Sequence, residues 1–177
     1  MAASAPGPLP LNYDANKETI MTATTDSKAI AVSMLKSSYY LFSKDLENMP
    51  EEAYNKSFGP ACRTVADIVY EVNMVNDHVG LTIRREELFA WPEGWIKAPA
   101  EFSSKETVIA AFKQSFERFM STAEAFSEEE MLEPLKDDDG KETNRFERCR
   151  FVALHNWYHS GQLNFIQTLL GDDGMHW

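Results

Sequence analysis

The chain has 177 residues, 44% of them hydrophobic and 12% aromatic, and this composition fits a single soluble globular domain with its own core. The formal net charge of −11 would repel the phosphates of a nucleic acid, so no nucleic-acid partner is expected. No apolar run approaches the roughly 20 residues that cross a bilayer, and the N-terminus lacks the basic-then-apolar order of a signal peptide. Cys62 and Cys149 form no Cys-x-x-Cys pair, which favours reduced thiols in a cytoplasmic protein without a membrane partner.

The chain divides into an arm and one folded domain. Residues 1–24 are rich in proline and small side chains, which predicts an irregular N-terminal arm, and residues 25–177 are expected to form the domain. Apolar residues repeat at helical spacing in four long segments of this domain. The segments lie at about 26–48, 64–88, 103–127 and 144–171.

Capping residues support the boundaries of these helices. The first helix is expected to start near Asp26, and the predicted N-caps of the others are Thr64, Ser103 and Asn144. The last three are each followed, three positions later, by the acidic residue that a capping box favours. Pro50 is expected to end the first helix, and Gly171 suits the left-handed position after the last one.

The connections between these helices show no convincing strand pattern. Residues 89–102 form a loop rich in Trp and Pro, and residues 128–134 predict a short turn of helix. Asp137–Gly140 predicts a tight turn, because its acidic run lacks the ligand spacing of a calcium-binding EF-hand. Four amphipathic helices without strands predict an all-α fold, a four-helix bundle.

His155 and His159 are the most informative residues of the chain. Four positions apart on a helix, their imidazoles project from one face, close enough to bind one metal ion. Both are expected to lie in the inward apolar stripe of the last helix, formed by Phe151, Leu154, Tyr158, Phe165, Ile166 and Leu169. A buried imidazole needs a partner for each ring nitrogen, which a metal ion or neighbouring carboxylates and hydroxyls would supply. The inward position favours the metal.

A third ligand has to come from another helix, since two ligands rarely hold a metal ion tightly. On the second helix, Glu71 and His78 stand seven residues apart on the edge of a valine-rich stripe. They are separated by about 10 Å along the axis at a rise of about 1.5 Å per residue, so one ion cannot bind both. The remaining histidine, His176, follows the last helix and is expected to be exposed.

The motif His155-x-x-x-His159-x-Gly161-Gln162 resembles that of the DinB-like (YfiT-like) proteins. A capped second helix opening at Thr64, the long Trp-rich connection after it and the order of the helices support the resemblance. It covers about residues 26–171. The resemblance implies a four-helix bundle in which three histidines typically bind a divalent metal ion.

The chain departs from this family pattern at one ligand. In the family, the first metal histidine usually stands seven residues after the Ser or Thr that opens the second helix, and here that position is Glu71. We expect Glu71 to replace the histidine and, with His155 and His159, to complete a site for zinc, nickel, iron or manganese. His78 is the substitute ligand if the register of the helix differs. In the alternative interpretation the site is weakened or lost, and Glu71 hydrogen-bonds to a neighbouring histidine.

Three protein ligands leave coordination positions open, where a metal ion can activate water or a thiol. Asn156 stands where the His-Glu-x-x-His motif carries its general base, so peptide hydrolysis of that type is disfavoured. The resemblance implies a metal-dependent thiol S-transferase or small-molecule hydrolase acting on a small-molecule substrate, with a low-molecular-weight thiol as a candidate. The alternative is a non-catalytic bundle, a stress-associated binding or scaffold protein with a degenerate metal site.

Further residues are expected near this site. Gln162 lies on the same helix face as His155 and could orient a ligand or a bound water. Trp91 and Trp95 are candidates for substrate contacts, and otherwise they cover the end of the bundle. Gly161 predicts the close approach of another helix, because glycine within a helix costs about 1 kcal/mol relative to alanine.

A homodimer is expected because relatives often pair through helix faces. Tyr39 and Tyr40 are candidate interface residues. No pattern in the sequence fixes the interface.

Overall fold

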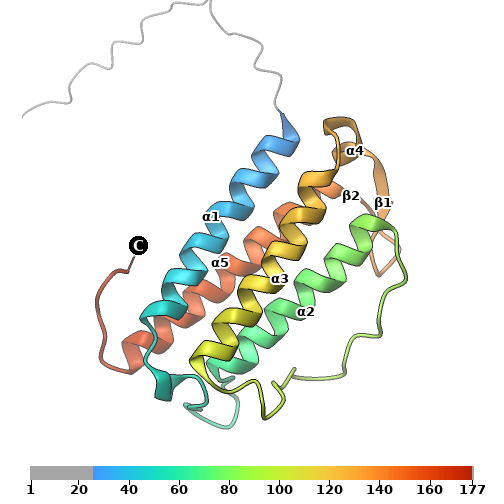
Figure 1. Cartoon of the computed structure of the whole chain (residues 1–177). Coiled ribbons are helices and arrows are strands. Elements are labelled where there is room, and N and C mark those ends of the chain that lie inside the picture. The colour runs from blue at the N-terminus through green and yellow to red at the C-terminus, as the bar shows by residue number, and fades with distance from the viewer. Residues whose placement is uncertain (1–25, 177) are drawn as a thin grey trace, which may run out of the picture.

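The structure, a computed structural model, describes residues 26–176, and the predicted arm of residues 1–24 lies outside this range. Four long helices lie side by side in an all-α bundle, which confirms the predicted fold class (Figure 1). They are α1 (Ser27–Asn48), α2 (Val65–Arg84), α3 (Lys105–Ala125) and α5 (Arg145–Leu169). The short elements are the 3-10 helix η1 (Glu51–Ala53), the helix α4 (Glu128–Leu132) and the strands β1 (Pro134–Lys136) and β2 (Glu142–Asn144). None of the described helices is long and apolar enough to span a membrane.

The helices run in pairs. In Figure 1, α1 and α5 point in one direction and α2 and α3 in the other, because the connection at residues 85–104 returns along the side of the bundle before α3 begins. The most extensive packing is between α1 and α5 and between α2 and α3. Smaller contacts of α1 with α3 and of α2 with α5 close the ring. The antiparallel α2–α5 contact is the one that positions the candidate site.

Capping side chains begin these helices, largely where the sequence indicates. Asp26 and Asn144 accept hydrogen bonds from backbone N–H groups of the first turn, and Thr64 forms a full capping box with Asp67. The third cap differs by one position, because α3 begins after Ser104 rather than Ser103, and the Thr107 N–H donates to the Ser104 hydroxyl.

The ends of two helices show left-handed residues. The backbone of Gly171 after α5 has a φ of +89°, as predicted for a glycine at that position. The second helix ends at Arg84, earlier than the predicted Leu88, because Arg85 adopts a φ of +60° and its N–H closes the last turn on Leu81 and Thr82.

A short hairpin corrects the expectation that the chain has no strands. β1 and β2 pair antiparallel around the tight turn at Asp137–Gly140, in the register Leu135 to Thr143. The turn is closed by a 2.9 Å hydrogen bond from the Gly140 N–H to the Asp137 carbonyl. Strands of three residues are too short to show an alternating pattern, so only the turn was visible in the sequence.

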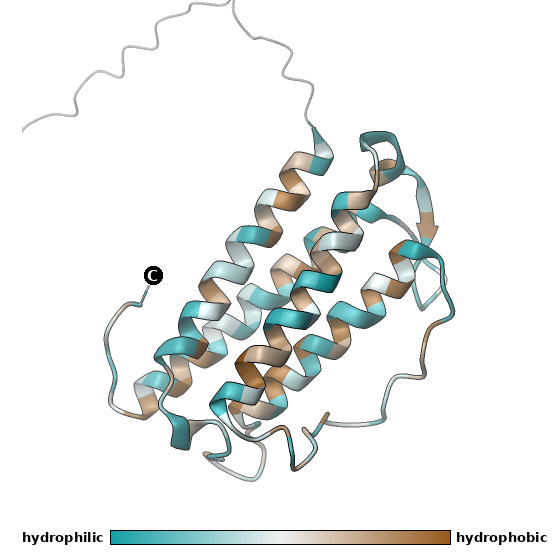
Figure 2. Cartoon of the chain, in the orientation of Figure 1, coloured by the Kyte–Doolittle hydropathy of each residue, from teal (hydrophilic) through white to brown (hydrophobic). Residues whose placement is uncertain are grey.

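The bundle core consists of two apolar clusters, one toward each end. Figure 2 shows hydrophilic and hydrophobic segments alternating along each long helix, as expected for amphipathic helices. The valine-rich stripe of α2 is buried throughout: Val65, Ile68, Val69, Val72, Val75, Val79 and Ile83. Between the clusters each long helix contributes a small buried polar residue, and these pair as Asn156 with Ser38 and Asn76 with Ser115, each at 3.3 Å.

The inward face of α5 is not the one that the aromatic stripe predicted. Of the six stripe residues only Ile166 is buried, and the others are 42–64% exposed. Instead α5 turns a face of small, apolar and polar residues inward: Cys149, Val152, Ala153, Asn156, His159, Ser160, Leu163, Ile166 and Gln167. This face repeats at the same helical spacing, so periodicity alone could not choose between the two.

Polar contacts with α1 fix this rotation of α5. Asp45, only 1% exposed, accepts hydrogen bonds from the Ser160 hydroxyl and, at 2.9 Å, from the Asn164 amide. The Gln167 amide donates to the Asp45 carbonyl at 3.3 Å. Burial raises the pKa of Asp45, and the hydrogen bonds from Ser160 and Asn164 partly offset that increase.

We therefore expect Asp45→Ala to lower the free energy of unfolding by about 2–3 kcal/mol, because it leaves the buried Ser160 hydroxyl without its acceptor and removes one of the two hydrogen bonds of the Asn164 amide. Urea denaturation measures the change. Glu47→Ala is the matched control on the same helix, since the Glu47 side chain forms an exposed ion pair with Lys44, and it should change stability by less than about 0.5 kcal/mol. Equal effects of the two substitutions would show that Asp45 does not hold the two helices together.

Candidate metal centre

Glu71 on α2 meets His155 and His159 on α5. One potential ligand atom of each residue lies within 4.8 Å of those of the other two. His159 is 1% exposed, and Glu71 and His155 are half-buried. The structure thus brings together the three residues that the sequence suggested as ligands, and we refer to them as the candidate metal centre.

The geometry of the group follows from the two helices. One helical turn separates the histidines, and their Nε2 atoms approach to 3.1 Å. The Glu71 carboxylate comes from the neighbouring antiparallel helix, with Oε2 3.9 Å from the His159 Nε2. Two imidazole nitrogens and a carboxylate oxygen are a donor set that zinc, iron, nickel and manganese all accept. The residues present therefore fit a divalent metal ion.

Gln162 orients His159. Its Oε1 lies 2.8 Å from the His159 Nδ1, and its amide nitrogen donates to the Tyr158 hydroxyl at 2.9 Å. The amide orientation assigns the proton of His159 to Nδ1, which leaves the Nε2 lone pair directed at the candidate metal centre. His155 lacks such support, because its buried Nδ1 has no hydrogen-bond partner in the described part of the chain.

Arg63 is the functional residue that sequence reasoning missed. Its Nη1 contacts the Glu71 carboxylate, and its Nη2 lies 3.3 Å from the Gln162 Oε1. The guanidinium also lies 5.1 Å from the ring centroid of Trp95. The sequence shows a basic residue directly before the predicted N-cap Thr64. Its contact with Glu71 depends on the fold of the loop that precedes α2, which the sequence does not show.

Burial keeps both histidines neutral. It lowers the pKa of His155 to about 4, with a further contribution from the positive charge of Arg63. It lowers the pKa of His159 to about 3, where His155 and Arg63 also oppose protonation. A neutral imidazole is the form that binds a metal ion, so both residues are prepared as ligands at neutral pH.

The structure places the other two histidines elsewhere. His78 stays outside the group, and its ring faces the edges of Phe89 and Trp91, with centroids at 4.9 and 5.6 Å. His176 lies near the end of the chain, 2.8 Å from the Asp172 carboxylate. The register of α2 thus presents Glu71, and not His78, to the histidines of α5.

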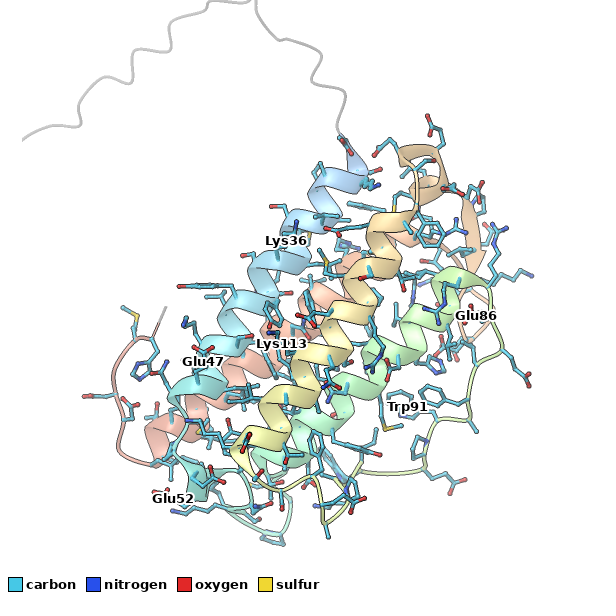
Figure 3. The ribbon with its side chains drawn as sticks, in the orientation of Figure 1. Lys36, Glu47, Glu52, Glu86, Trp91 and Lys113 are labelled. Carbon is cyan, nitrogen blue, oxygen red and sulfur yellow. The ribbon has the colours of Figure 1, made fainter. Side chains whose placement is uncertain are left out.

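The structure places Trp91 and Trp95 in different surroundings. Trp95 lies beside Arg63, next to the candidate metal centre. Trp91 projects from the long connection toward α2, where it packs against His78 (Figure 3). Of the two residues expected near substrate, only Trp95 contacts Arg63, the residue that pairs with Glu71.

A pocket of about 490 Å³ borders the candidate metal centre, and we call it the Arg63 pocket. It is lined by Phe58, Ala61, Cys62, Arg63, Ile68, Trp95, Tyr158, Gly161, Gln162, Phe165, Ile166 and Leu169. Arg63 and Gln162 form the wall next to Glu71 and His159. Gly161 faces this pocket, and a methyl group added there would meet nothing within 4 Å, so the predicted close approach of another helix is wrong.

A four-helix bundle with two histidines and a carboxylate on adjacent antiparallel helices defines the class of this protein. The profile of the DinB superfamily matches residues 34–163, and the chain belongs to that superfamily. No curated protein matches the sequence.

Two solved structures share the fold. A conserved protein from Enterococcus faecalis superposes with a TM-score of 0.63 at 15% identity, over 81% of this chain and 97% of its own. A DinB-like protein from Bacillus cereus ATCC 10987 superposes with a TM-score of 0.59 at 14% identity, over 78% of this chain and 91% of its own. At these identities the likeness establishes the fold alone.

Replacing Arg63 should strengthen metal binding. We expect Arg63→Met to raise the affinity for Zn²⁺ by about tenfold, because the guanidinium both repels a cation and occupies the Glu71 carboxylate. Competition with a chromophoric chelator measures the affinity, and Arg118→Met, at an exposed ion pair with Asp77, is the control. Weaker binding by Arg63→Met would mean that Arg63 supports the ligands instead of competing with the ion.

The affinity for Zn²⁺ should be nearly independent of pH between about 7 and 5. Protons compete with a metal ion only when the pH approaches the pKa of its ligands, and here these values are about 4 and 3. Two histidines with the ordinary pKa of about 6.5 would instead lose about a thousandfold in affinity by about pH 5. The same chelator competition at several pH values distinguishes the two cases, and a loss of that size would contradict the buried, neutral histidines.

Proposed function

We propose that this protein is a divalent-metal-dependent enzyme that activates a low-molecular-weight thiol or water, as a thiol S-transferase or a small-molecule hydrolase. The observation that supports this most is the convergence of Glu71, His155 and His159, whose ligand atoms lie within 4.8 Å of one another beside the Arg63 pocket. When bound, a divalent cation would lower the pKa of a thiol or water and polarise a substrate. Three protein ligands leave room for that group.

The lining of the Arg63 pocket favours thiol transfer over hydrolysis. Most of its walls are apolar, and the lining residues include no Asp, Glu or His. Hydrolysis commonly uses a general base to activate water, whereas a thiol that has lost its proton is already a strong nucleophile. An apolar electrophile would fit between Phe165, Trp95 and Ile68.

The residues of this chain have distinct roles in the proposal. His155, His159 and Glu71 hold the cation, and Gln162 keeps the His159 Nε2 lone pair directed at it. Arg63 stands between the ligands and the pocket, where its charge would stabilise an anion that develops on the substrate. Trp95 restrains Arg63 by stacking.

One observation favours the non-catalytic alternative. The Glu71 carboxylate contacts the Arg63 guanidinium, and an ion pair of this kind satisfies the charge of Glu71 without a metal ion. In that case the protein is a DinB-like bundle with a binding or scaffold role.

Metal analysis separates the two functions. We expect the purified chain, supplied with Zn²⁺, Ni²⁺, Fe²⁺ or Mn²⁺, to retain about one equivalent of ion, and His159→Ala and Glu71→Ala to lose it with little change in helical content. His78→Ala is the matched control, because His78 is also a buried histidine but lies outside the group, and it should retain the ion. Failure of the unaltered chain to bind any of the four ions would exclude the enzyme.

Thiol binding tests the substrate class. In the Co²⁺-loaded protein, benzyl mercaptan should produce a sulfur-to-cobalt charge-transfer band. Gly161→Leu should weaken that binding by about tenfold while retaining the ion, because its side chain fills the Arg63 pocket. Gly161→Ala is the conservative control, since the small methyl group meets no neighbour and should stabilise the helix by about 1 kcal/mol. If the protein binds the ion but shows no charge-transfer band with the thiol, the metal centre is supported and the thiol is excluded as its substrate.

We also propose that the protein forms a homodimer, as the sequence suggested. Tyr40 is 53% exposed and available for such an interface. Tyr39 is less suitable, because it stacks on Phe112 and Phe116 at 5.4 and 4.5 Å.

A further inference from the structure

A second cavity, of about 230 Å³, lies between α2, α5, the connection after α2 and the turn of the hairpin. We call it the His78 pocket. Val75 and Val79 contribute apolar walls from α2, and Trp91 closes one side from the connection (Figure 3). Phe151 of α5 lines it as well, and the same ring stacks on His155 at 5.9 Å. The cavity is therefore a neighbour of the candidate metal centre and separate from the Arg63 pocket.

Polar groups in this cavity lack partners. His78 is 5% exposed, and neither of its ring nitrogens makes a hydrogen bond in the described part of the chain. The Asp138 carboxylate lies 3.1 Å from the His78 Nε2, which is within ion-pair distance, but the contact lacks the geometry of a hydrogen bond. The Nε of Arg148 is also buried without a partner. Buried donors are almost always paired in folded proteins, so these groups point to a ligand.

The charge in the cavity selects an anion. The nearest ion-pair partner of Arg148 is Asp138, at 3.8 Å, and this carboxylate is half-exposed to solvent. The guanidinium lies over the Phe151 ring at 5.0 Å, which holds it in place. A fixed guanidinium that is only partly neutralised favours a carboxylate, whose two oxygens match the paired donors of arginine.

The walls of the cavity favour a ligand whose anionic group is attached to a flat apolar ring. Trp91 lines the cavity and meets the His78 ring edge to face, and Phe89, which does not line the cavity, stacks on Trp91 at an interplanar angle of 18°. Aromatic rings add to binding through stacked and edge-on contacts beyond the area they bury. The small volume limits the ligand to little more than one ring.

We propose that the His78 pocket binds a small aromatic carboxylate, with the carboxylate on Arg148 and His78 and the ring against Trp91, Phe151 and the valines of α2. This site is independent of the metal-dependent activity proposed above. An ion at the candidate metal centre is not required to hold the ligand, because the donors come from other residues.

Benzoate titrated into the full chain, followed by calorimetry after treatment with a chelator, tests the proposal. We expect benzoate to bind at least about tenfold more tightly than benzamide, which lacks the charge, and acetate, which lacks the ring. Chelation excludes direct coordination of the carboxylate by a metal ion. Equal binding of benzoate and benzamide, or binding of benzoate only when metal is present, would overturn the proposal and leave the metal centre untouched.

Variants locate the binding to this pocket. Arg148→Met should weaken benzoate binding by about tenfold, and Arg150→Met, at an exposed ion pair with Glu147 on the same helix, should not change it. Asp138→Asn should strengthen binding by about threefold, because it removes the competing carboxylate from Arg148. A gain in affinity cannot come from impaired folding. Equal effects of the two arginine substitutions, or weaker binding by Asp138→Asn, would overturn the proposal.

Discussion

The buried polar side chains of α5 constrain the rest of the structure. Asn156, Ser160 and Gln167 face the interior, where a buried polar group needs a hydrogen-bond partner, and each of them donates to a residue of α1. These requirements fix how α5 is rotated about its axis. A rotation that buried the aromatic stripe instead would bring large side chains into the bundle and expose the polar ones, with Asp45 left buried and unpaired.

The same rotation builds the candidate metal centre. With Asn156 and Ser160 turned toward α1, His155 and His159 face the next helix around the ring, which is α2. The antiparallel α2–α5 contact then places Glu71 opposite them. The arrangement of the three candidate ligands therefore depends on hydrogen bonds between α1 and α5 in which none of the three takes part.

Arg63 gives this centre an unusual electrostatic balance. A carboxylate beside two neutral imidazoles attracts a cation, while the guanidinium that contacts this carboxylate opposes it. The low pKa values of both histidines have the same origin, because burial and the positive charge of Arg63 disfavour their protonated forms. Arg63 thus connects the candidate metal centre to the neighbouring pocket, because it contacts Glu71 and also lines that pocket.

Much of the architecture could be predicted from the sequence. The four helices, the caps Thr64 and Asn144 and the buried stripe of α2 follow from local rules, because periodicity and capping depend on residues within a few positions of each other. The pairing of His155 with His159 is of this kind as well, since one helical turn brings them together. The hairpin was missed because strands of three residues carry no periodic signal.

Only the tertiary structure decided the rest. Two faces of α5 repeat at the same spacing, and the choice between them depended on polar partners on α1 that lie far away in the chain, as Ser160 and Asp45 do at a separation of 115 residues. The contact of Arg63 with Glu71, the separation of His78 from the α5 histidines and the different surroundings of Trp91 and Trp95 have the same character. Each is set by how helices and loops pack against one another, and no local pattern encodes that packing.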